Sequence, residues 1–95
     1  MKAILWWLIA GSKGGINRAR LIRELHDRPS NANQLTSRLG LDYKTVRFHL
    51  KILQENGIIE SIGDGRYGAV YMLSRQMEEA YPLFIDIWNK VEKHP

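Results

Sequence analysis

Six neighbouring residues combine the side-chain types that proteins use to contact nucleic acids. Three are cations, one carries a hydroxyl and two are aromatic, with no acid among them: Tyr43, Lys44, Thr45, Arg47, Phe48 and Lys51. A guanidinium can donate two parallel hydrogen bonds to O6 and N7 of guanine, and a phenyl ring can contact the thymine methyl group. Arg47 is therefore the first candidate for reading a base, and Lys44 and Lys51 are candidates for contacts with phosphates or bases.

Two flanking segments supply further candidates. Thr36 and Arg38 come shortly before the six residues and are candidates for contacts with the phosphate backbone. Residues 63–68 hold three glycines together with Arg66 and Tyr67. Such a glycine-rich tip is flexible, and an arginine on it can enter a minor groove or contact phosphate.

The charge of the chain suits a polyanionic partner. The 95 residues carry a formal net charge of +4. Residues 1–73 hold 11 Lys and Arg against 6 Asp and Glu, whereas residues 74–95 hold 3 against 4. The positive field thus belongs to the first part of the chain, as expected for a domain that binds nucleic acid or an anionic membrane surface.

Other function classes lack their characteristic residues. The chain has no cysteine, which excludes disulfides, thiolate metal sites and cysteine nucleophiles and fits a cytoplasmic protein. It shows no paired carboxylates on one element, no Walker-type phosphate loop and no nucleophile elbow. The glycines of 63–68 join two expected strands, so they offer no helix N-terminus to a phosphate. We predict a protein that is not an enzyme and has no metal, no cofactor and no small-molecule ligand.

The six residues are expected on the second of two short helices. Asn31 caps the first helix, with Gln34 three residues later in a capping-box arrangement, and Gly40 ends it. Asp42 then caps a helix over 43–56. Two abrupt, well-capped helices in succession predict a helix-turn-helix, whose second helix enters the major groove of DNA.

The opposite side of the second helix is apolar. Val46, Leu50 and Leu53 recur at helical spacing and predict the face that packs on the preceding helices. His49 lies beside them and is expected to pack in this core, because no other histidine is near it in the sequence to complete a metal site.

The remaining pattern predicts a wing and a supporting helix. A helical period runs over about 16–28 and stops at Pro29. The strand-like segments 58–62 and 69–73 flank the glycine-rich tip. The predicted fold class is mostly α with a small β-hairpin, a winged helix-turn-helix with additional N- and C-terminal helices.

Both ends of the chain are strongly apolar. Residues 3–10 resemble a short signal peptide, but the intracellular character of the remaining sequence favours a buried helix. Residues 74–93 predict a helix with an apolar stripe, kinked or restarted at Pro82. Since so short a chain leaves little to cover both helices, the segments 1–12 and 74–95 are expected to form a homodimer interface. Its predicted contacts are Leu5, Trp6, Leu8, Ile9, Tyr81, Phe84, Ile85 and Trp88.

Residues 16–73 resemble the winged-helix domain of the ArsR-like transcription regulators. The matching run covers 33–53, with the core Thr-Val-x-x-His-Leu-x-x-Leu at 45–53, and continues with Asn-Gly-Ile-Ile at 56–59. The chain looks most like the compact archaeal members and lacks the cysteines of the metal-sensing ones; Arg47 stands where the family usually has serine. The resemblance implies a dimeric, cytoplasmic protein that binds double-stranded DNA and dimerises through its outer helices.

These observations predict a single domain over 1–95 that acts as a sequence-specific, double-stranded DNA-binding transcription regulator. The recognition helix 43–56 is expected in the major groove, and the wing 63–68 on the flanking backbone or in the minor groove. The alternative is a winged-helix module that contacts other proteins without reading DNA. RNA binding is less favoured, because no platform for stacking single-stranded bases is visible.

Overall fold

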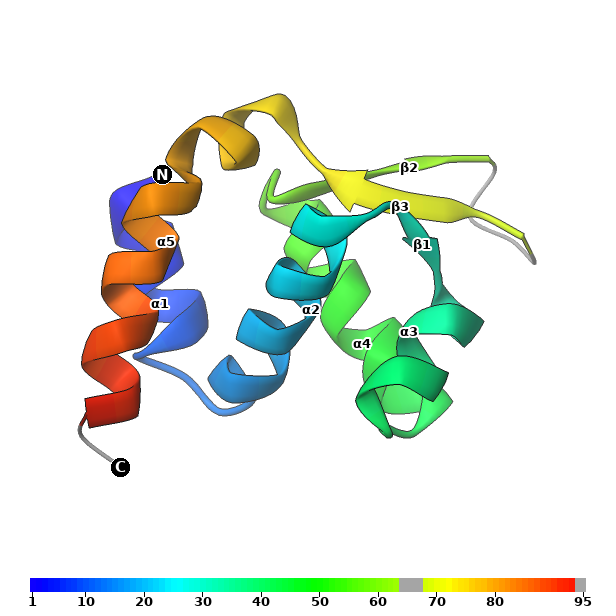
Figure 1. The fold of residues 1–95 in the computed structure, drawn as a ribbon, viewed down its shortest axis with the longest axis horizontal. Coiled ribbons are helices and arrows are strands. Elements are labelled where there is room, and N and C mark those ends of the chain that lie inside the picture. Colours follow the sequence, from blue (N-terminus) through cyan, green and yellow to red (C-terminus); the bar gives the residue numbers. More distant parts are fainter. Residues whose placement is uncertain (64–67, 94–95) are drawn as a thin grey trace.

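Five helices and three short strands make up the part of the chain that the computed structural model describes, residues 1–63 and 68–93 (Figure 1). In chain order they are α1 (Lys2–Ile9), α2 (Gly15–Asp27), β1 (Ser30–Asn31), α3 (Ala32–Leu39), α4 (Tyr43–Glu55), β2 (Ile59–Ile62), β3 (Val70–Leu73) and α5 (Arg75–Lys93). Figure 1 shows α1 and α5 side by side at one end of the molecule, with α3 and the strands toward the other.

The two capped helices predicted from the sequence are α3 and α4. Asn31 and Gln34 exchange backbone-to-side-chain hydrogen bonds of 2.8 Å each, which completes the capping box. Gly40 ends α3 with a φ of 65°, a left-handed conformation that a side chain would resist. The Asp42 carboxylate then accepts from the Thr45 amide at 3.2 Å and caps α4. Local side-chain chemistry therefore confirms the predicted turn between the two helices.

The sheet has one strand more than the predicted hairpin. β3 lies in the middle and pairs antiparallel with β2 on one side and β1 on the other. Ser30 pairs with Tyr71, and Asn31 pairs with Val70. A two-residue strand is too short to show an alternating pattern, so β1 could be found only from the pairing that β3 offers it.

The apolar N-terminal helix is covered mainly by its own chain. α1 packs against α2 and α5, and its buried residues Leu5, Leu8 and Ile9 lie on one face. Gly15 permits this close approach, because a Cβ there would lie 1.9 Å from the carbonyl oxygen of Ile9. The sequence suggested that a second subunit would cover α1. This expectation is corrected, because the apolar stripe of α5 covers the buried face of α1 within the same chain.

α5 begins where the sequence indicated and continues past its proline. Ser74 Oγ accepts from the Met77 amide at 3.1 Å and caps the helix. Pro82 lies within one continuous helix, so the helix does not restart, although its first turns lie at an angle to the rest (Figure 1). Met77, Phe84 and Trp88 bury the predicted stripe. None of the helices in the described ranges combines the length and the apolar character that crossing a membrane requires.

Candidate nucleic-acid interface

α4 has the two faces that its sequence predicts. Val46, Leu50 and Leu53 are at most 1 % exposed and anchor the helix in the core. On the opposite side, Tyr43 is 46 % exposed and Phe48 is 60 % exposed. An exposed phenyl ring on a helix is unfavourable in water, so this face has the character of a contact surface.

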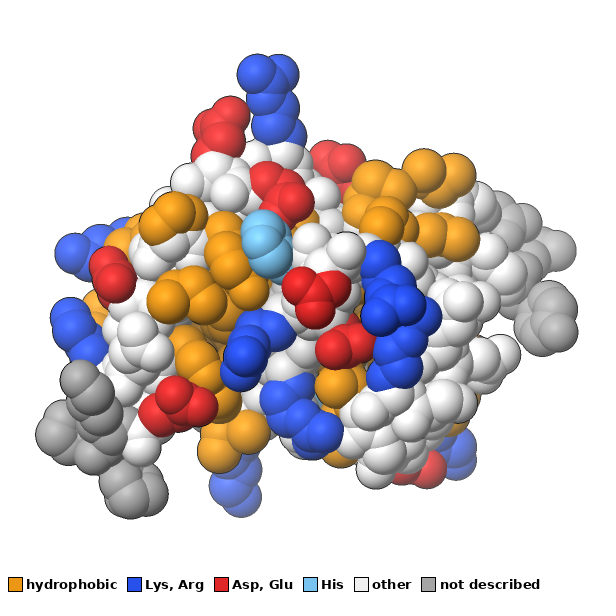
Figure 2. Space-filling model, viewed as in Figure 1, with side chains coloured by type: hydrophobic (Ala, Val, Ile, Leu, Met, Phe, Trp, Pro, Cys, Tyr) orange, Lys and Arg blue, Asp and Glu red, His pale blue; other side chains and the backbone are white. Residues whose placement is uncertain are grey.

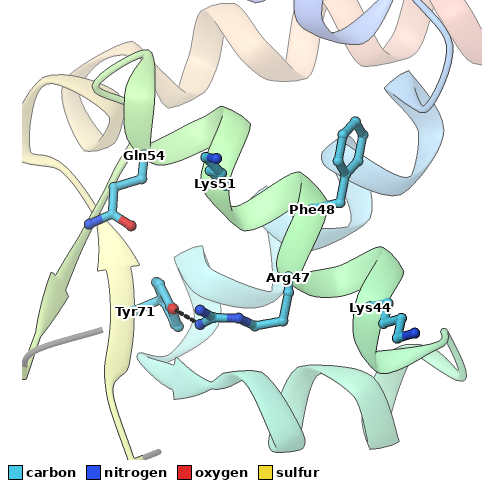
Figure 3. A pocket seen from close by; sticks show the side chains of 6 residues that line it. All are labelled: Lys44, Arg47, Phe48, Lys51, Gln54 and Tyr71. Carbon is cyan, nitrogen blue, oxygen red and sulfur yellow. Dashed lines mark hydrogen bonds between the residues drawn. The ribbon is translucent and has the colours of Figure 1, made fainter. Parts of the chain in front are cut away.

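The cations of α4 surround a groove of about 340 Å³ (Figure 3). In this groove Lys44 and Lys51 are exposed, Arg47 is half-buried, and β3 contributes Tyr71; Thr45 is half-buried and does not line the groove. The lining residues are Lys44, Arg47, Phe48, Lys51, Gln54 and Tyr71, none of which is acidic. By contrast, the face seen in Figure 2 carries acidic and basic side chains interspersed. The groove is thus a locally positive surface that offers several hydrogen-bond donors.

Arg47 does not extend freely into solvent. Its Nη1 donates to the hydroxyl of Tyr71 at 2.5 Å, so the guanidinium bridges α4 and β3 (Figure 3). Phe48, its neighbour, points away from that strand in the same view. A guanidinium carries five N–H donors, so the bond to Tyr71 is compatible with donation to a ligand in the groove.

A buried cation supports α4 from beneath. Arg18 of α2 is 2 % exposed and donates to the carbonyls of Leu8 and Lys13 at 2.8 Å, to Ser12 Oγ, and to His49 Nδ1 at 3.3 Å. Since arginine only donates, His49 must accept with an unprotonated Nδ1. Burial lowers the pKa of Arg18, and burial followed by the nearby Arg18 charge lowers the pKa of His49. The prediction that His49 packs in the core is confirmed.

Of the two phosphate contacts predicted on α3, Thr36 turns its hydroxyl into the protein, whereas Arg38 is exposed and also contacts neighbouring elements. Arg38 Nη1 donates to Ser30 Oγ at 2.7 Å and lies 3.9 Å from the Glu24 carboxylate. Thr36 Oγ1 is buried, with no hydrogen-bond partner among the described residues. The structure therefore does not support a phosphate contact for Thr36, because its hydroxyl has no surface, and it gives Arg38 a bridging role between α3, β1 and α2. Arg66 and Tyr67 lie outside the described residues.

The residues predicted for the dimer interface divide into two groups. Most of those on the inner faces of α1 and α5 are buried within the single chain and cannot reach a second copy without a rearrangement of the core: Leu5, Leu8, Ile9, Phe84 and, less completely, Trp88. Trp6 is 36 % exposed, with Lys90 Nζ 5.8 Å from its ring centroid, and Tyr81 and Ile85 are half-buried. The neighbouring Trp7 and Ile16, which were not predicted as contacts, are more exposed than these.

Sequence reasoning missed Tyr71, Gln54 and Arg18 as parts of this region. A signal existed for Arg18, because it shares the helical spacing of the buried Ile22 and Leu25. Tyr71 falls on a strand position that alternation buries, and a buried tyrosine hydroxyl usually needs a partner. Nothing local indicated that its partner would be Arg47.

Comparison with known proteins agrees with this arrangement. Residues 17–62 match the family described as a helix-turn-helix domain. Among solved structures, the chain is similar to Rv0081 of M. tuberculosis, with a TM-score of 0.72 at 19 % identity over 97 % of this chain and 89 % of that one. The fold is a winged helix-turn-helix. In this winged helix-turn-helix protein, α3 and α4 form the helix pair, β2 and β3 carry the wing, and α1 and α5 flank them.

Two further structures share the winged helix-turn-helix fold at similarly low identity. Diamide-treated YodB of B. subtilis has a TM-score of 0.69 at 18 % identity, covering 99 % of this chain and 91 % of that one. Reduced HlyU of Vibrio cholerae has a TM-score of 0.68 at 20 % identity, covering 92 % and 88 %. No curated protein matches the chain.

Proposed function

We propose that this protein binds double-stranded DNA sequence-specifically and regulates transcription. α4 enters the major groove, and residues 63–68, with Arg66 and Tyr67 assigned from sequence alone, contact the flanking backbone or minor groove. One observation carries the proposal: an exposed helical face presents cations around a groove that has no acidic lining residue. Such a face attracts phosphates and aims donors at base edges.

Charge removal on α4 tests the proposal. Lys44→Gln and Lys51→Gln are each expected to weaken duplex binding and to make the dependence of log K on log salt shallower by about 0.9 for each phosphate that is no longer neutralised. The matched control is Arg75→Gln, because Arg75 is an exposed cation on α5, outside the groove. Fluorescence anisotropy titrations between low and moderate salt provide the measurement.

The control separates a local contact from the general field of the protein. Equal losses in all three variants would mean that only net charge matters and would contradict binding through α4. A folded protein with no affinity for any duplex even at low salt would favour the alternative function, contact with other proteins.

Sequence specificity is tested by selection of bound duplexes from a random pool. We expect an enriched pseudo-palindrome whose half-sites lie about 34–36 Å apart, because a two-fold dimer presents two recognition helices to successive major grooves on one side of the duplex. If the recovered duplexes shared no sequence, the protein would bind DNA without reading its bases, and the proposed sequence specificity would be wrong.

The homodimer in this proposal forms through the outer surfaces of α1 and α5. Support comes from the exposed apolar side chains of Trp7 and Ile16 and from two neighbouring grooves of about 500 and 390 Å³ that include Ala10 and Val91. Exposed apolar surface concentrated at one end of a small protein is typical of an interface.

A further inference from the structure

Tyr71 occupies a strand position that is held from both sides. β3 is the central strand, and Tyr71 pairs with Ser30 of β1 on one side and Ser61 of β2 on the other. The residue is only 3 % exposed. Because both neighbouring strands hold its backbone and the core holds its ring, its hydroxyl has a fixed position relative to α4.

Arg47 reaches this fixed hydroxyl from the recognition helix. The bond from Nη1 to the Tyr71 oxygen measures 2.5 Å, and both residues line the 340 Å³ groove as well as a small adjoining groove toward Asn33 and Gly68. Lys44 and Lys51 lie on the same helix face and are exposed. On this face of α4, Arg47 is thus the cation that is hydrogen-bonded to β3, one of the two strands that flank the wing.

An arginine side chain loses considerable rotamer freedom when it becomes ordered. That loss weakens binding if it occurs on contact with DNA, and it is avoided if the side chain is already ordered in the free protein. A hydrogen bond to a phenol uses one of the five N–H donors of a guanidinium, so it is compatible with donation to O6 and N7 of guanine.

We propose that Tyr71 is a positioning residue for base readout, which holds the Arg47 guanidinium in place before DNA arrives. The inference rests on the proposed DNA-binding function and deepens it, because it assigns sequence discrimination to a pair of residues contributed by the helix and by the wing strand. Tyr71 itself need not touch a base.

The first experiment uses the free protein. Nitrogen-15 relaxation of arginine Nε–Hε groups reports the order of each guanidinium on the picosecond to nanosecond scale. In the wild type, Arg47 should be more ordered than Arg75, whose side chain is 94 % exposed. In Tyr71→Phe, which keeps the buried ring, Arg47 should become more mobile while thermal melting shows that the protein remains folded.

The second experiment measures discrimination between a selected duplex and an unrelated duplex of equal length. Tyr71→Phe should lower affinity for the selected duplex by about 3- to 10-fold, the range expected when one side chain must be ordered on binding. Affinity for the unrelated duplex should stay within about twofold, because phosphate contacts do not depend on this pair. In a double-mutant cycle, Tyr71→Phe should have no further effect in the Arg47→Gln background.

A second double-mutant cycle, combining Tyr71→Phe with Lys51→Gln, serves as the control. Lys51 lines the same groove, but the hydrogen bond that Tyr71 accepts comes from Arg47. These two changes should add. Equal loss on both duplexes, additivity with Arg47→Gln, or an Arg47 guanidinium as mobile as that of Arg75 would each overturn the positioning role. If the wild type bound no duplex, the proposed DNA-binding function would be wrong, and the readout role would fail with it. This outcome differs from failure of the positioning role alone, because the Arg47 guanidinium would still be more ordered than that of Arg75 in the free protein.

Discussion

Arg18 is a cation enclosed by the protein, and no counter-charge among the described residues contacts it directly. Its partners are two carbonyl groups, a hydroxyl and the ring of His49, all of them uncharged while His49 is neutral. Burying a charge is unfavourable unless its hydrogen bonds are satisfied. The Arg18 site therefore depends on a neutral His49, and through it the loop after α1 is connected to α4.

This dependence predicts a loss of stability at mildly acidic pH. Because the pKa of His49 is lowered in the folded protein, the unfolded chain binds the proton more readily. The stabilisation is complete above about pH 6.5, the ordinary value for histidine, and is lost as the pH falls from there through the lower folded pKa. Thermal melting from about pH 7.5 to about pH 5 should show a decreasing Tm.

The substitution His49→Gln keeps an acceptor for Arg18 and removes the titrating group, so it should flatten this pH dependence. The control His26→Gln changes the histidine that pairs with Glu78 on α5. If His26→Gln flattened the profile and His49→Gln did not, the assignment to His49 would be wrong.

At the scale of residues, prediction succeeded where local spacing decides the outcome. The helical period of the apolar residues predicted which side of α4 faces the core. The exposure of its aromatic side chains followed, because they lie on the opposite side. The direction of the Arg47 side chain did not follow, because its partner Tyr71 lies 24 residues away on another element. The inward direction of the Thr36 hydroxyl and the contact of Arg38 with Ser30 did not follow from the sequence either, since they depend on how α3 packs against its neighbours.

At the scale of elements, the junction between α1 and α2 depends on Gly15. A methyl group there would lie 1.9 Å from a backbone oxygen, which only a shift of the helices could relieve. We expect Gly15→Ala to destabilise the protein by about 3 kcal/mol, at the upper end for overpacking. Urea unfolding followed by circular dichroism gives the value.

Gly40→Ala is the matched control for Gly15→Ala. Apart from Gly40 and its two chain neighbours, no atom of the described residues lies within 4 Å of a Cβ built at Gly40. The cost is therefore only left-handed backbone strain, partly offset by a less flexible unfolded chain. We expect a destabilisation of about 1 kcal/mol. Equal effects at the two glycines would show that the helices can separate at little cost.

The caps explain why helix ends were predicted better than strands. Asn31, Gly40, Asp42 and Ser74 each act on backbone groups within four residues, so their roles are visible in the sequence. Strand β1 has no such local signature, because its hydrogen bonds come from β3, which follows it much later in the chain.

At the scale of the whole molecule, the exposed end of α1 predicts the state of assembly. Trp7 is 54 % exposed, and Trp7→Glu would place a carboxylate on the proposed dimer surface. We expect the wild type to sediment as a dimer at micromolar concentration and Trp7→Glu to dissociate at least about tenfold more readily, equivalent to about 1.4 kcal/mol.

Ile62→Glu makes the same change at a comparably exposed apolar side chain on β2, away from α1 and α5, and should leave the dimer intact. A monomeric wild type, or equal dissociation of both variants, would contradict an interface on α1 and α5.

The apolar character of both chain ends was evident from sequence. That the two helices bury much of it against each other was not, because periodicity shows which face is apolar and says nothing of what covers it.

Asn31 belongs to two structures at once: it pairs with Val70 of the central strand and caps α3. The wing strand and the helix-turn-helix therefore share a residue, and neither can tilt without the other. In the proposed complex, in which α4 and the wing both contact DNA, the protein would hold the spacing of these two contacts fixed, and the duplex would have to bend or twist to fit. Binding should then vary with the stiffness of base pairs that no side chain touches, strongest where flexible pyrimidine–purine steps lie between the contacts.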